Sequence, residues 1–177
     1  MLYHLHITLS EVYTPNVWRR IAVPSQLTFY KLHKVIQKAF GWQDYHLFRF
    51  MDSERSLMSI DWFAHSFEIG IPDPEDDQPV MNAKKTRISD VIPATRKLKY
   101  IYDFGDYWEH VITFEKIDSS DSKHTVLLGG EGACPPEDCG GPTGYEHVKI
   151  VLANPAHEEH EEMKTWIGLK KKPTLGP

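Results

Sequence analysis

The order in which two kinds of hydrophobic periodicity follow one another limits the fold of this chain more than any other feature. Residues 2–12 place an apolar side chain at every second position, which is typical of a half-buried strand, and residues 17–23 form a second strand after a Pro-Asn break. One amphipathic helix, further strands and two more helices follow. Because strands and helices do not alternate regularly, a parallel doubly wound sheet is disfavoured. The order predicts an α+β fold with a mostly antiparallel sheet, one N-terminal helix and two C-terminal helices packed against it.

The first helix and the strand after it carry clear boundary signals. Residues 28–40 repeat apolar side chains at helical spacing, Thr28 can cap the start of the helix, and Gly41 suits the left-handed position past its end. The strand that follows is expected to turn Leu47 and Phe48 toward the core.

The middle of the chain predicts loops and a hairpin. Residues 71–80 are acidic and rich in proline, which is typical of an exposed loop, and residues 86–93 predict one helical turn that Pro93 stops. Residues 97–117 read as two strands around the turn "DFGDY", in which Gly105 can take a positive φ. A further strand is expected over 124–132.

Capping signals also place the two C-terminal helices. Thr143 and Glu146 have the spacing of a capping box at the start of the first helix. Asn154 can cap the second helix, with Pro155 in its first turn and Gly168 at its end.

Length and charge bound the class of protein. With 177 residues, we expect one domain over residues 1–169 and a basic tail over 170–177. The net charge of −5 argues against a nucleic-acid partner, which needs clustered basic residues. No apolar run is long enough to cross a bilayer, and the N-terminus lacks the features of a signal peptide. A cytoplasmic protein with reduced cysteines and no membrane partner is therefore expected.

The stretch "YDFGDYWEH" is the densest group of chemically active side chains. Asp103 and Asp106 flank a glycine turn and His110 follows four residues later, and these ligand types suit manganese, iron or zinc. The structural alternative is equally concrete, because aspartates are good turn residues and His110 shares a strand face with Trp108. A protein-kinase reading of "DFG" fails, since neither a glycine-rich phosphate loop nor a His-Arg-Asp loop is present.

Residues 129–145 form a second candidate segment, rich in glycine and proline. Glu137 and Asp138 add carboxylates that can complete a divalent metal site. Cys134 and Cys139 stand as one pair, so a structural zinc ion would need histidines from elsewhere, and a cysteine nucleophile would need a histidine partner. An ordered loop without chemistry is the alternative. The histidines in "HEEHEE" are three residues apart, which is not the zinc-protease spacing.

Four stretches taken together resemble the plasmid pRiA4b ORF-3-like family. The stretches are "PNVWRRIAVP", "AFGWQDYHLFRF", "YIYDFGDYWEHVI" and "CPPEDCGGPTGYE", in this order. The resemblance spans residues 3–166 and implies an α+β fold. It implies little about activity: the family is generally described as uncharacterised, and some relatives carry labels tied to transposon resolvases or occur beside DNA-binding or zinc domains. No helix-turn-helix or arginine-supported nucleophilic serine can be placed in this chain. The association with mobile elements therefore rests only on the labels of some relatives.

The leading hypothesis is a small-ligand-binding or protein-interaction module, whose partner is an unknown small molecule or protein. Its predicted ligand-binding residues are Trp18, Arg19, His46, Tyr102, Trp108 and Tyr145. The alternative is a metal-dependent hydrolase or nuclease with a divalent ion as cofactor, and its predicted ligands are Asp103, Asp106, His110, Glu137 and Asp138. A resolvase-associated DNA protein is the weaker alternative. The sequence leaves open whether the protein is an enzyme.

Overall fold

The chain divides into two compact units. The computed structural model describes residues 1–52, 67–73 and 80–169, and the units are Met1–Cys134 and Pro135–Pro177. Most of the predicted acidic loop and the whole predicted basic tail lie outside the described residues. The expectation of one domain over residues 1–169 stays a prediction.

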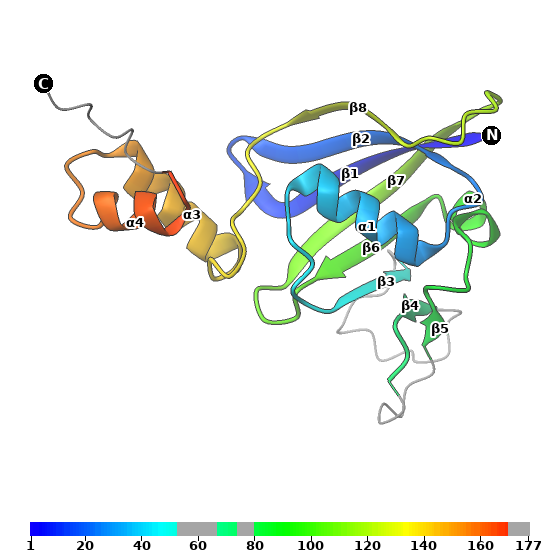
Figure 1. The fold of residues 1–177 in the computed structure, drawn as a ribbon, viewed down its shortest axis with the longest axis horizontal. Helices are drawn as coiled ribbons and strands as arrows, with labels where there is room; N and C mark the ends of the chain where they lie inside the picture. The colour runs from blue at the N-terminus through cyan, green and yellow to red at the C-terminus, as the bar shows by residue number, and fades with distance from the viewer. Residues whose placement is uncertain (53–66, 74–79, 170–177) are drawn as a thin grey trace, which may run out of the picture. The chain divides into compact units, whose positions relative to one another are not determined.

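One eight-stranded sheet forms the frame of the first unit (Figure 1). Its strand order is β5-β4-β3-β6-β7-β1-β2-β8, and every neighbouring pair is antiparallel except β4 and β5. The predicted α+β fold with a mostly antiparallel sheet is therefore confirmed, and the sheet is mixed. The strands are β1 (Leu2–Tyr13), β2 (Asn16–Pro24), β3 (Phe48–Asp52), β4 (Glu68–Gly70), β5 (Met81–Asn82), β6 (Lys97–Tyr102), β7 (Trp108–Asp118) and β8 (Val126–Glu131).

The alternation along the central strands builds the core. In β1, Leu5 and Ile7 have no exposed surface, whereas His6 between them is half-buried. In β6, Tyr100 and Tyr102 are fully buried on one face. These faces match the predicted strand patterns, since side chains in a strand alternate between the two faces of a sheet.

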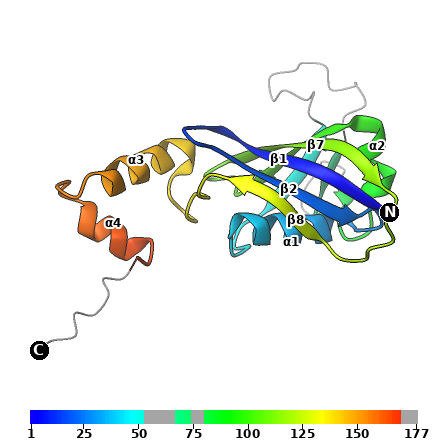
Figure 2. The ribbon, with the colours of Figure 1, turned by 90° about the horizontal axis from the view of Figure 1, so that it is seen from above.

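Helix α1 (Phe29–Phe40) lies along one face of this sheet (Figures 1 and 2). Thr28 is its N-cap, and its hydroxyl accepts a hydrogen bond from Lys31 N at 3.4 Å. Gly41 follows the helix with φ 83° and donates to the Gln37 carbonyl. Both predicted caps are confirmed. The buried face of α1 also contains His33 and Gln37, which the apolar pattern did not reveal.

Two expectations for this unit are wrong. The Leu47 side chain is 67% exposed, because β3 begins one residue later with the buried Phe48. Gly105 does not have a positive φ. The turn between β6 and β7 places Asp103 at φ 57° and Tyr107 at φ 55° instead.

Hydrogen bonds explain why a non-glycine residue adopts the left-handed conformation in this turn. The Asp103 carboxylate accepts a bond from Gly105 N at 2.9 Å, and its carbonyl accepts one from Tyr107 N at 2.7 Å. Aspartate tolerates the left-handed region because its short polar side chain can bond to nearby backbone.

The predicted helical turn at residues 86–93 is replaced by two short elements. A 3-10 turn covers Ile88–Asp90, and helix α2 covers Ile92–Thr95. Pro93 is the second residue of α2, in its first turn, and does not stop a turn. Proline is tolerated in the first turn because its missing N–H has no intrahelical partner there.

The second unit contains helices α3 (Gly141–Ala153) and α4 (His160–Trp166). The buried His160 connects them, since its Nδ1 lies 2.9 Å from the Val151 carbonyl oxygen. The predicted packing of these helices against the sheet stays a prediction.

The predicted N-caps of both helices are wrong. Helix α3 starts earlier, with Gly140 as its N-cap, so Thr143 lies inside it. Asn154 is the C-cap of α3, and its side chain accepts a bond from Ala156 N at 3.1 Å. It therefore stabilises the turn between the helices. None of the helices in the described part of the chain is both long and apolar enough to cross a membrane.

Candidate functional site

A pocket of about 610 Å³ opens in the first unit beside the start of β3. It receives side chains from α1, from the segment between α1 and β3, from the residues after β4 and from the β6–β7 turn. Its lining residues are Tyr30, Asp44, His46, Leu47, Phe48, Arg49, Ile71, Pro72, Asp73 and Phe104. This volume lies within the range of sites that take small organic ligands.

Backbone contacts fix the segment that carries His46 into the pocket. Asp44 has φ 62°, and its N–H donates to the side chain of Gln37 at 3.0 Å. The next residue, Tyr45, donates its N–H to the hydroxyl of Tyr102 at 3.1 Å. Tyr102 therefore positions the segment from inside the core, where its side chain has no exposed surface.

Four residues, one of which (Asp44) lines the pocket, form a closed hydrogen-bond ring. Asp44 N–H donates to Gln37 Oε1 at 3.0 Å, and Gln37 Nε2 donates to the Tyr100 hydroxyl at 3.0 Å. The Tyr100 hydroxyl donates to His33 Nδ1 at 2.9 Å, and His33 Nε2–H donates to Asp44 Oδ1 at 2.6 Å. Every donor in the ring faces an acceptor only if His33 is neutral, with its proton on Nε2 and a lone pair on Nδ1.

Burial keeps His33 in that neutral form. Burial, and then the nearby Lys34 ammonium, lower the pKa of His33 to about 3. Its ring stacks on Phe48 at a centroid distance of 3.7 Å and an interplanar angle of 10°. The hydrogen-bond ring thus fixes Asp44, which also accepts a bond from Lys34, at the wall of the pocket.

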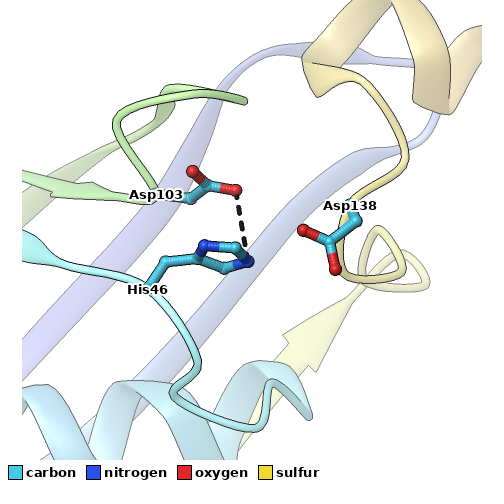
Figure 3. Close-up of side chains that lie close together, drawn as sticks. All are labelled: His46, Asp103 and Asp138. Atoms are coloured by element: carbon cyan, nitrogen blue, oxygen red, sulfur yellow. Dashed lines mark ion pairs between the residues drawn. The ribbon is translucent and has the colours of Figure 1, made fainter.

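His46 and Asp103 form a second polar group at this site (Figure 3). His46 Nε2 lies 3.6 Å from Asp103 Oδ2, which is an ion-pair distance and too long for a hydrogen bond. The Asp103 side chain is nearly buried, at 9% exposure, and its other oxygen is held by Gly105 N. One carboxylate oxygen is therefore held in a fixed position facing an imidazole nitrogen.

Arg49 supplies the positive charge of the pocket. Its Nη1 donates to Glu68 Oε2 at 2.5 Å, which connects β3 to β4. The guanidinium carbon lies 5.9 Å from the centroid of the Phe104 ring, within the range of a cation–π contact. Phe104 is 45% exposed although it is aromatic, so the pocket wall offers apolar surface to solvent.

Besides Tyr102, two predicted site residues of the first unit, Trp108 and His110, lie in the core. Both have no exposed surface. His110 Nδ1 lies 3.2 Å from the Tyr100 carbonyl oxygen and 3.0 Å from that of Trp108, so it carries the proton. Burial lowers the pKa of His110 to about 4, although these two backbone bonds act in the opposite direction. Its Nε2 is buried without a hydrogen-bond partner among the described residues.

All five N–H donors of the Arg19 guanidinium form hydrogen bonds within the protein. Nε donates to the Ala39 carbonyl at 3.0 Å, and Nη1 donates to the carbonyls of Trp18 and Glu131 at 2.7 and 2.8 Å. Nη2 donates to the Gly132 carbonyl at 3.1 Å and to Cys134 Sγ at 2.9 Å. Arg19 therefore joins β2, the end of α1 and the end of β8, and its predicted role in ligand binding stays a prediction.

The remaining predicted residues of the first unit are Trp18, Cys134 and Asp106. Trp18 is half-buried and donates its Nε1–H to Glu131 Oε2 at 3.1 Å. Burial raises the pKa of Cys134 to about 11, although Arg19 acts in the opposite direction. Cys134 is thus a neutral thiol, which is unsuited to nucleophilic attack. Asp106 is half-buried in the β6–β7 turn.

The second unit holds the other predicted residues. Glu137 is half-buried, Asp138 is exposed with φ 56°, and Tyr145 is buried with Lys149 Nζ at 5.1 Å from its ring centroid. Cys139 is a free thiol, as is Cys134. The predicted metal ligands thus come from both units, and their joint role stays a prediction.

Several residues of the pocket were not predicted as site residues. Arg49 lies in "AFGWQDYHLFRF" and Phe104 in "YIYDFGDYWEHVI", but no spacing rule joins them. His33 and Gln37 did have a usable signal: they lie four residues apart on the apolar face of a helix. A pair of polar side chains on such a face indicates a buried hydrogen-bond network.

Comparison with known proteins places the chain in a family. The family model described as "Plasmid pRiA4b ORF-3-like protein" matches residues 1–174. The chain therefore belongs to this family, which confirms the resemblance seen in the sequence.

Two relatives support this assignment. The uncharacterized protein y4hQ of Sinorhizobium fredii is 36% identical over 167 residues, which cover 93% of this chain and 79% of that protein. The crystal structure of MM3350 from Methanosarcina mazei Go1, a protein of unknown function, has a TM-score of 0.80 and 34% identity, covering 97% of this chain and 92% of that one. The similarity to these proteins supports the fold, and their names state no activity.

Proposed function

We propose that this chain is a small-ligand-binding module whose site is the pocket beside β3. The observation that carries the proposal is the combination of apolar walls with a few fixed polar groups in one cavity of about 610 Å³. Sites for small organic molecules have this composition, because apolar area supplies affinity and polar groups supply orientation.

The apolar walls favour a ligand with an aromatic or aliphatic body. Tyr30 and Phe48 line the cavity from α1 and β3, Ile71 and Pro72 follow β4, and Phe104 lies on the β6–β7 turn. Ile71 and Phe104 are 38% and 45% exposed, so a ligand that covers them removes apolar surface from water.

The polar groups are held in place before any ligand arrives. Asp44 is fixed by the hydrogen-bond ring and Arg49 by its bond to Glu68. Fixed polar groups lose little conformational entropy on binding, which increases affinity for a ligand that matches them. The pairing of an acid with a guanidinium in one cavity favours a ligand with both a donor and an acceptor.

A fragment screen by two-dimensional ¹H–¹⁵N NMR tests this proposal. With a library of small aromatic and heteroaromatic compounds, we expect the amide shifts of Leu47, Arg49 and Phe104 to move together. Phe104→Ala should weaken binding of the best fragment by about ten-fold, because a large part of the apolar wall is lost.

Tyr107→Ala is the matched control for this variant. Tyr107 lies in the same turn and is 37% exposed, but it does not line the cavity. Fragment binding should be unchanged in this variant. Shifts that cluster away from the pocket, or equal losses in the two variants, would show that the pocket is not the site.

Divalent metal binding is a second candidate function, favoured by the His46–Asp103 pair. Two ligand atoms bound to one tetrahedral zinc ion at ordinary bond lengths lie about 3.4 Å apart. The observed separation of 3.6 Å between Nε2 and Oδ2 is close to this value. The pair would supply two of the ligands of such an ion.

The metal candidate is tested by thermal unfolding with and without added Zn²⁺ or Mn²⁺ after treatment with a chelator. An ion held only by the folded state at one hundred times its Kd adds about 2.7 kcal/mol of stability. We expect Asp103→Asn to remove the increase in Tm.

Asp118→Asn is the matched control for Asp103→Asn. His4 Nε2 also lies 3.6 Å from Asp118 Oδ2, but outside the pocket. The increase in Tm should persist in this variant. If neither ion raises the Tm, the metal candidate and the hydrolase or nuclease built on it are both excluded, whereas fragment binding is unaffected.

The resolvase-associated DNA alternative gains no support from charge. The net charge is −5, and the Arg19 and Arg20 side chains that the sequence places side by side both bond to protein groups. We therefore do not propose it.

A further inference from the structure

Helix α1 and the segment after β5 carry a group of basic residues on a chain whose net charge is −5. Residues 24–41 and 82–89 contain five lysines and one arginine, and neither an aspartate nor a glutamate. All six side chains are exposed, and together we call them the basic face: Lys31, Lys34, Lys38, Lys84, Lys85 and Arg87. The two stretches are far apart in the sequence, so the fold brings these charges together.

Contacts at the start of α1 join the two stretches into one surface. Tyr30 N donates to the Ala83 carbonyl at 2.9 Å. The centroid of the Tyr30 ring lies 5.4 Å from Lys34 Nζ and 5.3 Å from Lys84 Nζ. The lysines of both stretches therefore meet at one aromatic ring, on the exposed side of a helix whose other side covers the sheet (Figures 1 and 2).

Most charges of the basic face are not neutralised within the protein. Lys34 forms an ion pair with Asp44, and Arg87 donates to Gln26 Oε1 at 2.9 Å. The other four lysines form no ion pair with any residue that the structure describes. The three lysines of α1 follow one another at about 4.5 and 6 Å along the helix axis, and like charges at this spacing repel one another. An anionic partner would remove this repulsion.

The basic face lacks the features that would select a folded protein or a nucleic acid. None of the exposed large apolar side chains lies in residues 24–41 or 82–89, whereas protein interfaces depend on such anchors. The N–H groups that begin α1 are occupied as well: Phe29 N donates to the Thr86 carbonyl at 3.0 Å, and Lys31 N to the Thr28 hydroxyl at 3.4 Å. Directed phosphate contacts use free N–H groups and arginine forks, but five of these six cations are lysines. What remains is attraction between point charges and an extended anionic surface.

We propose that the basic face docks on the surface of an anionic phospholipid bilayer. Clusters of basic residues on an amphipathic helix are attracted to such a surface without a groove or an apolar anchor. The sequence predicts no membrane partner because it has no segment that crosses a bilayer, but a helix can lie against the surface without crossing it.

The charge and burial of the first unit define what kind of docking this is. The apolar side of α1 is buried, with Leu32 and Ile36 fully enclosed, so it does not insert into the lipid. Acidic groups elsewhere in the chain are largely screened once they lie more than about 8 Å from the lipid at physiological salt. Docking is therefore electrostatic, reversible and sensitive to salt.

Co-sedimentation of the full chain with lipid vesicles tests the proposal. Vesicles made from an equal mixture of phosphatidylcholine and phosphatidylglycerol should bind the protein, and vesicles of phosphatidylcholine alone should not. Binding is expected at about 0.1 M salt, where the Debye length is about 10 Å, and should be lost at about 1 M salt, where it is about 3 Å.

A double charge reversal, Lys31→Glu with Lys85→Glu, tests the basic face itself. It should weaken binding to the mixed vesicles by at least about 25-fold, because each lysine near an anionic surface contributes about five-fold to the affinity. Both side chains are exposed, and circular dichroism and urea unfolding check that the variant folds. Lys97→Glu with Lys116→Glu is the matched control: it changes the net charge equally, at exposed positions of β6 and β7 outside the basic face. Its binding should fall by less than about three-fold.

Three outcomes would overturn the proposal. One is a protein that stays in the supernatant with the mixed vesicles at low salt. Another is an equal loss of binding in the two double variants, which would show that net charge matters and the basic face does not. The third is tighter binding to a single-stranded or duplex oligonucleotide than to the vesicles at the same salt concentration, which would assign the basic face to nucleic acid. None of these outcomes bears on fragment binding at the pocket.

Discussion

Tyr100 shows how a single buried hydroxyl organises the wall of a pocket that it does not line. It accepts a bond from Gln37 and donates one to His33, and through them it fixes Asp44 at the pocket wall. The Tyr100 side chain is fully buried, so each of these bonds replaces one that water would make in the unfolded chain.

The first prediction concerns this hydroxyl. Tyr100→Phe leaves one buried acceptor on His33 and one buried donor on Gln37 without their partner. We expect the free energy of unfolding to fall by about 1–3 kcal/mol. Urea unfolding measures the change as a lower midpoint with an unchanged slope. Tyr13→Phe alters a side chain that is 74% exposed and should change stability by less than about 0.5 kcal/mol.

At the scale of elements, Arg19 joins three segments that are distant in the sequence. Its guanidinium bonds to the Ala39 carbonyl at the end of α1, to Glu131 in β8 and to the residues up to Cys134. It also lies over the ring of Phe40 at 5.3 Å. The planar fork of arginine suits several carbonyls at once, and lysine cannot reproduce it.

The second prediction follows from this geometry. Arg19→Lys should lower the free energy of unfolding by about 2 kcal/mol or more, because partly buried carbonyls lose their donors. Hydrogen exchange should become faster over residues 126–134. The neighbour Arg20 is 44% exposed and pairs with Glu115 at 2.9 Å, so Arg20→Lys should cost less than about 1 kcal/mol. Equal effects of the two variants would contradict the structural role of Arg19.

For the whole molecule, two buried neutral histidines link stability to pH. The pKa of His33 is lowered from 6.5 to about 3 and that of His110 from 6.5 to about 4, in both cases chiefly by burial. Between these values and pH 6.5, the unfolded chain binds protons that the folded chain does not. Stability therefore rises with pH in this window and falls as the solution is acidified.

The third prediction is the slope of that dependence. Between pH 6.5 and pH 4, His110 should contribute up to about 1.4 kcal/mol of lost stability per pH unit. Urea unfolding at a series of pH values measures the slope, and His110→Gln should make it shallower by about this amount. The control His124→Gln replaces an exposed histidine and should leave the slope unchanged. A His110→Gln variant with the original slope would show that His110 titrates alike in the folded and unfolded states.

Local signals predicted the parts of this protein that depend on neighbouring residues. The alternation of β1 follows from Leu5 and Ile7 at alternate positions, and the limits of α1 follow from Thr28 and Gly41. These features are set by backbone geometry and by burial of one face, which a short stretch of sequence specifies. The same reasoning failed at Thr143 and Asn154, because many polar residues can cap a helix and only the packed chain selects one.

Local sequence signals predicted only part of the candidate site. His46 and Asp103 were each singled out from the sequence, but their separation of 3.6 Å depends on how the segment after α1 meets the β6–β7 turn. Arg49 and Phe104 approach each other for the same reason.

The amino-acid sequence by itself determined the class of fold, the two-residue and helical periodicities, and membership of the pRiA4b ORF-3-like family. Only the tertiary structure decided which polar residues are buried, which strands form the edges of the sheet and which side chains share a pocket. The physical reason is that periodicity is a property of adjacent residues, whereas burial and proximity arise when segments distant in the sequence pack together.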